Sequence, residues 1–262
     1  EVRLGEFGRG TTEDELIAAL RGVDGIISRG EPYTRRVLEA AERLRVISRT
    51  GVGYDSIDLG AATARGIVVC TSVGSNDRTV ADYAVMLMLA LARRLIENHT
   101  NLKGHGRFER PVSLDFYGKT VGVIGVGTIG KHVVRRVRAF DCAVLGNDVV
   151  RDNGFATLAG MQYVPLETLL RESDFVTIHV PLHASTRHLI GERELGLMKP
   201  TAYLVNTARG PVIDQDALYR TLKERRIAGA GLDVFRKEPL EPDSPLRSLD
   251  TVILTSHAAG GS

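Results

Sequence analysis

The sequence predicts an α/β fold, in which helices pack against parallel β-sheets. Two observations support this: helical and extended patterns alternate along the 262 residues, and one stretch combines an apolar strand, three spaced glycines and a helix. The hydrophobic content of 43% suffices for ordinary cores. The 34 basic and 32 acidic residues leave a net charge of +2. Composition therefore gives no indication of a nucleic-acid or membrane partner.

The first part of the chain alternates short helices and strands. Helices are predicted at 13–20, 34–41 and 58–64, and strands at 25–28, 45–48 and 67–70. Ligands of such sheets bind beyond the carboxyl ends of the strands. Arg29 and Arg49 follow the first two strands, and the glycine-containing loop after Arg49 can offer N–H groups to a carboxylate or phosphate. Each arginine alone is equally consistent with a solvated side chain, but together with the loop they favour an anionic substrate.

A long helix is predicted next, and Thr79 and Asp82 have the spacing of a capping box at its start. From Val80 to Ala92 the pattern is apolar nearly all round, which requires burial on several sides. This run is shorter than the roughly 20 residues that cross a membrane. We therefore predict two domains, 1–76 and 77–262, and a homodimer formed through the Val80–Ala92 region. The polar segment 101–114 is expected on the surface.

Residues 120–148 contain the clearest ligand-binding pattern. Gly125, Gly127 and Gly130 follow an apolar strand with the spacing G-x-G-x-x-G, where a helix begins. The first glycine allows the tight turn, the second lets the backbone approach a pyrophosphate, and the third lets the helix pack on the strand. Asp148 ends the next strand, where a carboxylate can bind a ribose diol, which favours NAD over NADP. The pattern predicts a Rossmann-type cofactor domain, and the alternative is a βα turn without a ligand.

The alternation resumes after this stretch and predicts a second mononucleotide-binding half. Helices are expected at 165–171, 192–198 and 214–225, and strands at 175–179, 203–206, 229–232 and 252–255. Arg209, Glu238 and His257 each follow one of these strands. A guanidinium can hold a carboxylate and polarise a carbonyl, and histidine can exchange a proton near neutral pH. With Glu238 orienting the histidine ring, this set predicts hydride transfer to a 2-oxo acid.

Two further observations concern the cysteines and the two ends of the chain. Cys70 and Cys142 each lie in an apolar, strand-like run, so we expect two buried, reduced thiols, as in a cytoplasmic protein. No signal peptide is visible, and no apolar run reaches transmembrane length. The chain begins without methionine and stops directly after a strand, so both ends look cut.

Seven ordered motifs resemble those of the D-isomer-specific 2-hydroxyacid dehydrogenases across essentially the whole chain. They begin at Gly51, Asn76, Gly118, Pro181, Asn206, Ala230 and Ser256. The resemblance implies that Arg209 binds and polarises the substrate, and that Glu238 pairs with His257, the acid/base. It further implies an NAD site formed by Gly125, Gly127, Thr128, Ile129, Gly130, Asp148, Val180, Pro181, Thr207, Ala208, Asp233, Ala259 and Gly260. Val52, Gly53 and Asn76 would face substrate and nicotinamide, and no metal is expected.

The same resemblance bears on the fold and the substrate. It implies a flavodoxin-like α/β substrate domain, incomplete at both ends because the family's first strand and helix and its last segments are missing from this chain. Arg29 and Arg49 lie where D-3-phosphoglycerate dehydrogenases present cations to the substrate phosphate. This implies oxidation of 3-phosphoglycerate to 3-phosphohydroxypyruvate, which leads to serine. The alternatives are a glyoxylate or hydroxypyruvate reductase, whose relatives have an uncharged residue in place of Arg49, and an NAD-responsive corepressor.

Overall fold

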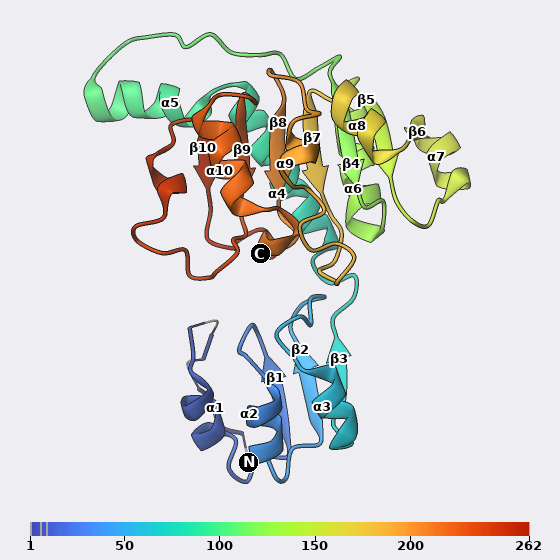
Figure 1. Cartoon of the computed structure of the whole chain (residues 1–262), viewed down its shortest axis with the longest axis vertical. Helices are drawn as coiled ribbons and strands as arrows, with labels where there is room; N and C mark the ends of the chain where they lie inside the picture. The colour runs from blue at the N-terminus through green and yellow to red at the C-terminus, as the bar shows by residue number, and fades with distance from the viewer. Residues whose placement is uncertain (1, 6, 9, 262) are drawn as a thin grey trace. The chain divides into compact units, whose positions relative to one another are not determined.

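The structure is a computed structural model that describes residues 2–5, 7–8 and 10–261. It forms two compact units, one that extends to Asn76 and one that begins at Asp77. Each unit contains one parallel sheet flanked by helices (Figure 1). The predicted α/β class is confirmed.

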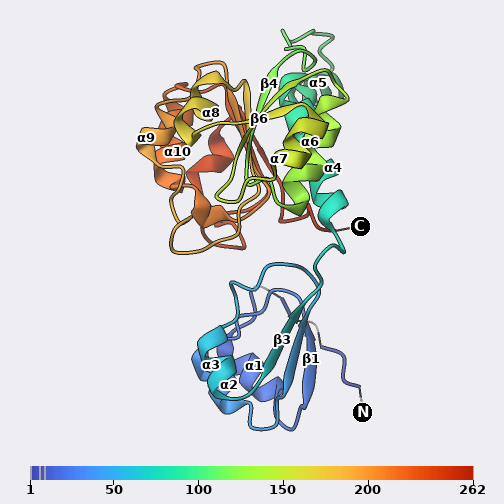
Figure 2. The ribbon, with the colours of Figure 1, turned by 90° about the vertical axis from the view of Figure 1, so that its right-hand side faces the viewer.

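The first unit contains a three-stranded parallel sheet in the order β1-β2-β3. Its strands are β1 (Gly25–Ser28), β2 (Val46–Arg49) and β3 (Val68–Thr71), and its helices are α1 (Glu13–Ala19), α2 (Arg35–Ala40) and α3 (Leu59–Ala64). The side chains of Thr12, Thr34 and Asp58 cap the three helices by accepting backbone N–H groups. The helices lie on one face of the sheet (Figure 2), where Leu16, Leu38 and other apolar side chains form a buried core.

The opposite face of this sheet carries exposed apolar side chains. Ile27 is 80% exposed and Val68 is 58% exposed. Successive side chains of a strand point to opposite faces, and Cys70 lies two residues after Val68 on the same face. The prediction of two buried thiols is therefore wrong for Cys70, which is exposed, and correct for Cys142, which is buried.

The second unit contains a seven-stranded, fully parallel sheet in the order β10-β9-β8-β7-β4-β5-β6. The strands are β4 (Thr120–Ile124), β5 (Ala143–Asn147), β6 (Met161–Tyr163), β7 (Phe175–Ile178), β8 (Tyr203–Asn206), β9 (Gly229–Leu232) and β10 (Val252–Leu254). The chain runs outward from β4 through β5 to β6, and then returns to the other side of β4 at β7. This reversal is the topological switch point at which dinucleotides bind in such sheets.

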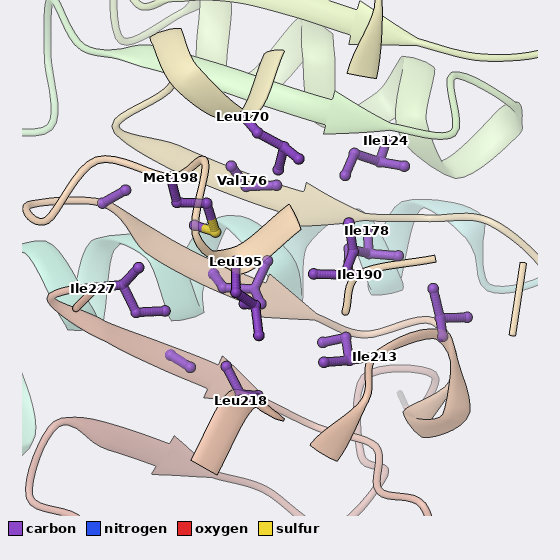
Figure 3. Close-up of a cluster of buried hydrophobic side chains, with 14 of the residues drawn as sticks. Ile124, Leu170, Val176, Ile178, Ile190, Leu195, Met198, Ile213, Leu218 and Ile227 are labelled. Atoms are coloured by element: carbon purple, nitrogen blue, oxygen red, sulfur yellow. The ribbon is translucent and has the colours of Figure 1, made fainter. Parts of the chain in front are cut away.

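Helices cover both faces of this sheet (Figure 2). They are α4 (Asp77–Ala92), α5 (Leu95–His99), α6 (Thr128–Arg138), α7 (Asn153–Ala159), α8 (Leu166–Glu172), α9 (Glu192–Leu195) and α10 (Gln215–Lys223). One core lies under α8, α9 and α10, and Figure 3 shows Leu170, Leu195 and Leu218 from these helices beside Ile124 and Ile178 from the strands. The other core packs α4 and α6 against the opposite face. Because helices cover both faces of the sheet, the central strands are buried on both sides, and this explains the continuous apolar runs in their sequences.

Three details of the second unit differ from the sequence predictions or extend them. Helix α4 begins at Asp77, so Thr79 lies in its first turn and the predicted capping box at Thr79 is wrong. The elements α7 and β6 were not predicted, because β6 has only three residues and a polar one at its centre. After α5 a π-helical turn at Thr100–Gly104 begins a largely exposed segment that leads to β4. Among the described residues, no helix has the length and apolar character to cross a membrane.

Candidate active site

The glycine-rich loop connects β4 to α6 at the switch point. Gly125 has a left-handed backbone with φ of 89°, and its N–H donates to the carbonyl of Asn147 on β5 at 2.8 Å. A Cβ on Gly130 would lie 2.1 Å from the carbonyl oxygen of Gly125, so the helix can pack this closely only with glycine. A Cβ on Gly127 would meet no atom within 4 Å. Packing therefore requires glycine at 125 and 130, whereas Gly127 borders open space.

This loop fits the pyrophosphate of a dinucleotide. Gly127 is the N-cap residue of α6, and since it has no side chain, it cannot satisfy the first N–H groups of that helix. Those N–H groups and the positive end of the helix dipole favour an anion. The open space beside Gly127 is where the phosphates would approach the backbone.

Asp148 follows β5 and is fixed by the loop itself. One carboxylate oxygen, Oδ2, accepts the N–H of Val126 at 2.6 Å, and Oδ1 accepts the N–H of Val150 at 3.0 Å. A carboxylate has about four acceptor positions, so these two bonds leave capacity for a ribose diol. Asp148 thus links the tip of the glycine loop to the position expected for the adenosine ribose.

Replacing Asp148 with alanine is expected to weaken NADH binding by about 10- to 100-fold, the equivalent of hydrogen bonds to one charged group. Turnover at saturating cofactor is expected to change little, because Asp148 lies on the β5 side of the switch point and His257 follows β10. Fluorescence titration with NADH and the KM for the cofactor measure the effect. Asp152→Ala is the matched control, since this nearby acid caps α7 through Phe155; an equal loss in both variants would contradict the assignment.

Arg209 lies in the loop after β8, and its turn is held by Asn206. The Asn206 side chain is buried; its Nδ2 donates to the carbonyl of Arg209 at 2.9 Å, and its Oδ1 accepts the N–H of Ala208 at 3.0 Å. Gly210 follows, and a Cβ there would lie 2.0 Å from the carbonyl of Phe235. The loop after β8 is thus packed directly on the backbone of the loop after β9.

Glu238 and His257 form a hydrogen-bonded pair. Glu238 lies in the loop after β9, and its Oε2 is 2.8 Å from Nδ1 of His257, which follows β10. The other oxygen, Oε1, accepts the N–H of Phe235 at 3.0 Å. The side chains are largely buried, with 13% of Glu238 and 25% of His257 exposed. Because one carboxylate oxygen is anchored to the backbone, the other holds the imidazole in a fixed orientation.

Asp233 holds the backbone of the loop that carries His257. Its side chain is fully buried; Oδ1 accepts the hydroxyl of Thr255 at 2.5 Å and the N–H of Ala258 at 2.9 Å, and Oδ2 accepts the N–H of Ala259 at 2.9 Å. The N–H of His257 donates to the carbonyl of Asp233 at 2.8 Å. These bonds hold His257 in a left-handed conformation with φ of 54°, which costs free energy in a residue with a side chain.

The remaining predicted NAD-site residues lie in the first turn of α6 or in the loops that follow strands of the second unit. Ile129 lies in the first turn of α6, Val180 and Pro181 follow β7, Thr207 and Ala208 follow β8, and Gly260 lies in the loop after β10. Thr128 and Pro181 are exposed, whereas Thr207 and Ala259 are buried. Three supporting residues were not predicted, namely Asn206, Thr255 and His179. The only signal for them is a polar residue at or just past the end of a buried strand.

His179 is one of these unpredicted polar residues at the end of a buried strand. Its ring lies at the end of β7, where Nε2 is 2.9 Å from the hydroxyl of Thr177. Burial lowers the pKa of His179 to about 3, so the ring is neutral at physiological pH. Its Nδ1 is buried and has no hydrogen-bond partner among the described residues.

The predicted substrate residues belong to the first unit, apart from the catalytic set. Arg29 is exposed after β1, whereas Arg49 is only 6% exposed. The Nε of Arg49 donates to the carbonyl of Gly53 at 2.7 Å, which shapes the glycine loop that also contains Val52. Asn76 ends the unit, and its Oδ1 is buried without a partner in the part of the chain that the structure describes.

Together, the sheet order and the glycine loop at its switch point define a dinucleotide-binding protein. A family model for the NAD-binding domain of D-isomer specific 2-hydroxyacid dehydrogenases matches residues 85–259. The chain therefore belongs to this family, and its second unit contains the family's NAD-binding domain.

Individual relatives agree with this placement. The chain is 46% identical to a glyoxylate reductase from Korarchaeum cryptofilum, over 94% of this chain and 76% of that protein. It is 43% identical to a D-3-phosphoglycerate dehydrogenase from Methanocaldococcus jannaschii, over 98% of this chain but only 49% of that protein. Among solved structures, the TT0316 protein from Thermus thermophilus superposes with a TM-score of 0.90 at 34% identity, covering 100% of this chain and 83% of that one.

Proposed function

We propose that the protein transfers hydride between NAD and a small D-2-hydroxy acid or the corresponding 2-oxo acid, with Arg209, Glu238 and His257 as the catalytic residues. The observation that carries the proposal is the 2.8 Å contact between Glu238 Oε2 and His257 Nδ1. It lies at the end of strands β9 and β10, beside the loop after β8 that carries Arg209. NAD, when bound, supplies the hydride acceptor, and NADH the donor.

The Glu238 carboxylate determines which ring nitrogen of His257 exchanges protons. A carboxylate is an acceptor only, so Nδ1 carries a proton toward Glu238. The other nitrogen, Nε2, is then the atom that gives a proton to the carbonyl oxygen during reduction and removes it from the hydroxyl during oxidation. The negative charge of Glu238 stabilises the imidazolium form that reduction requires. Arg209 binds the substrate carboxylate and polarises the carbonyl with its guanidinium fork.

For the physiological substrate we propose an unphosphorylated 2-oxo acid such as glyoxylate or hydroxypyruvate. The 46% identity to a glyoxylate reductase supports this choice. So does the burial of Arg49, whose Nε is committed to the carbonyl of Gly53. A buried guanidinium engaged with its own loop is less available to a substrate phosphate.

The second candidate is 3-phosphohydroxypyruvate, which would place the protein in serine biosynthesis. The exposed guanidinium of Arg29 and the 43% identity to a D-3-phosphoglycerate dehydrogenase favour it. The chain spans about half the length of that relative. Under either candidate we propose a cytoplasmic location, which the two free cysteines support.

The test follows NADH absorbance with the purified protein. It compares kcat/KM for glyoxylate, hydroxypyruvate and 3-phosphohydroxypyruvate. A preference for the unphosphorylated acids supports our choice, and a preference for the phosphorylated acid supports the second candidate. No turnover with any of the three would contradict the proposed reaction and favour a corepressor that binds NAD.

We also propose that α4 forms a homodimer interface. A groove of about 590 Å³ lies along its outer side and is lined by Met86, Leu89, Ala90 and Phe140, among others. Met86 is 45% exposed, although the opposite side of α4 is buried in the core. The groove is bordered by charges of both signs, since Arg136 Nε contacts Asp82 at 2.5 Å. A surface that is apolar at its centre and carries both charges at its edge can complement a second copy of itself.

Met86→Asp is expected to convert a dimer into a monomer, because a carboxylate would be desolvated at the centre of the groove. Light scattering coupled to size-exclusion chromatography measures the mass. The control is Leu158→Asp on α7, where the side chain is 90% exposed and far from α4 in sequence. A wild-type protein that is monomeric at micromolar concentration would contradict the interface.

A further inference from the structure

His257 lies just past the end of an edge strand. In the sheet that the structure describes, β10 lies beside β9 alone (Figure 1), and it has only three residues, all of them partly exposed. The last pair in the register of the two strands is Leu254 with Leu232. The end of β10 is therefore not held by a second strand or by a fully buried side chain, and the position of His257 depends on contacts beyond the last pair.

Two backbone hydrogen bonds continue past the last pair. The N–H of Thr255 donates to the carbonyl of Leu232 at 3.0 Å, and the N–H of His257 donates to the carbonyl of Asp233 at 2.8 Å. At His257 the backbone then enters the left-handed region, with φ of 54°. A residue with a side chain stays in this region only where its surroundings hold it there. The contacts on both sides of His257 must therefore offset the cost of this conformation.

The fully buried carboxylate of Asp233 makes contacts on both sides of His257. It accepts the hydroxyl of Thr255 at 2.5 Å, the N–H of Ala258 at 2.9 Å and the N–H of Ala259 at 2.9 Å. An O–H···O contact this short is typical of a hydrogen bond to an ionised carboxylate, which is about twice as strong as a neutral one. Of these three donors only Thr255 uses its side chain, so its hydrogen bond is the one that a substitution can remove.

We propose that Thr255 is a positioning residue for the acid/base His257 and that it acts through Asp233. The inference rests on the proposed function, because it concerns the histidine of that reaction. Glu238 fixes the orientation of the imidazole ring, whereas the bond between Thr255 and Asp233 fixes the backbone from which the ring extends. Without the hydroxyl, the buried carboxylate loses one of these donors, and the left-handed turn loses its contact on the β10 side. A displaced backbone moves the ring away from the position at which it exchanges a proton.

Thr255→Val tests the proposal, because valine keeps the shape of threonine and removes the hydroxyl. Protein with one equivalent of NADH is mixed in a stopped-flow instrument with a saturating 2-oxo acid, namely whichever of glyoxylate, hydroxypyruvate and 3-phosphohydroxypyruvate the wild type reduces fastest. The rate constant of NADH oxidation is expected to fall about 10- to 100-fold, as for a small misplacement of a catalytic group, while the amplitude stays unchanged. Thr255→Ser keeps the hydroxyl and is expected to restore most of the rate. Mere loss of folded protein would lower the amplitude and leave the rate constant as it was.

The matched control is Thr251→Val, which makes the same chemical change just before β10 and is expected to leave the rate constant unchanged. An unchanged rate constant in Thr255→Val, or an equal loss in both variants, would overturn the role of Thr255 and leave the proposed reaction standing. If Thr255→Val fails to fold, Thr255→Ala takes its place in the comparison with Thr255→Ser.

Hydrogen exchange separates this inference from the proposed reaction, because it needs no turnover. The segment 257–261 contains the two N–H groups that Asp233 accepts, and its amides are expected to exchange faster in Thr255→Val than in the wild type. A wild type that reduces none of the three acids would contradict the proposed reaction, whatever the exchange shows. Unchanged exchange of this segment in Thr255→Val would overturn the inference by itself, since the hydroxyl would then not hold the backbone around His257.

Discussion

Replacing His257 with alanine is expected to lower kcat by about 100- to 10,000-fold, the range for loss of a positioned general acid/base. The variant keeps the glycine loop and Asp148 intact, so its NADH affinity should stay close to that of the wild type. Stopped-flow or steady-state NADH absorbance measures the first quantity, and fluorescence titration the second. We therefore expect kcat to fall while the affinity for NADH stays nearly unchanged.

A matched control for this variant is available in the same unit. His183 is exposed and follows β7, and His183→Ala is expected to retain full turnover. Loss of turnover in both variants would mean that the loss is not specific to His257, and it would contradict the acid/base assignment. Full turnover in His257→Ala would show that another group exchanges the proton.

Gly130 and Gly127, two of the three glycines of the loop, are expected to respond to alanine in different ways. Gly130→Ala places a Cβ 2.1 Å from the Gly125 carbonyl, so α6 must move away from β4. Overpacking of this kind costs about 1–3 kcal/mol or more, and in a unit of this size we expect the melting temperature to fall by roughly 5–10 °C. NADH binding should fall with it, because the helix N-terminus is displaced.

Gly127→Ala is expected to leave the melting temperature of the cofactor-free protein nearly unchanged. Its Cβ would meet no atom within 4 Å, and the φ of −72° at this residue suits alanine. NADH affinity should nevertheless fall at least about tenfold, because the methyl group occupies the space through which the pyrophosphate approaches the backbone. Thermal unfolding without cofactor and NADH titration measure the two properties. Equal destabilisation by both substitutions would contradict this division of roles.

The fold class could be predicted because periodicity and glycine spacing are local properties of the sequence. The strand before Gly125 and the helix after it follow from apolar runs of characteristic length. The three-residue β6 was missed because so short a run has no measurable periodicity. The exposure of Cys70 was missed for another reason: alternation shows that β3 has two faces, but not which of them helices cover.

For the candidate site too, the sequence predicted the positions of residues along the chain but not the contacts that hold them. Arg209, Glu238 and His257 were named from their positions after strands, which the residue order alone reveals. The anchoring of Glu238 by the Phe235 N–H depends on the conformation of a turn. Arg49 could be placed at a strand end from the sequence, but its burial and its bond to Gly53 required the packed loop. Such details come from tertiary contacts rather than from local patterns.

The close packing of Gly210 on the backbone of Phe235 restricts how the loops after β8 and β9 can move. The guanidinium-bearing turn and the segment that leads to Glu238 are joined by main-chain contact, so neither can shift without the other. The conformational entropy of these two loops is therefore lost when the protein folds, and under the proposed mechanism it is not lost again at each turnover. If Arg209 and Glu238 have the roles proposed above, the backbones of the two loops that carry them are already in contact before a substrate binds.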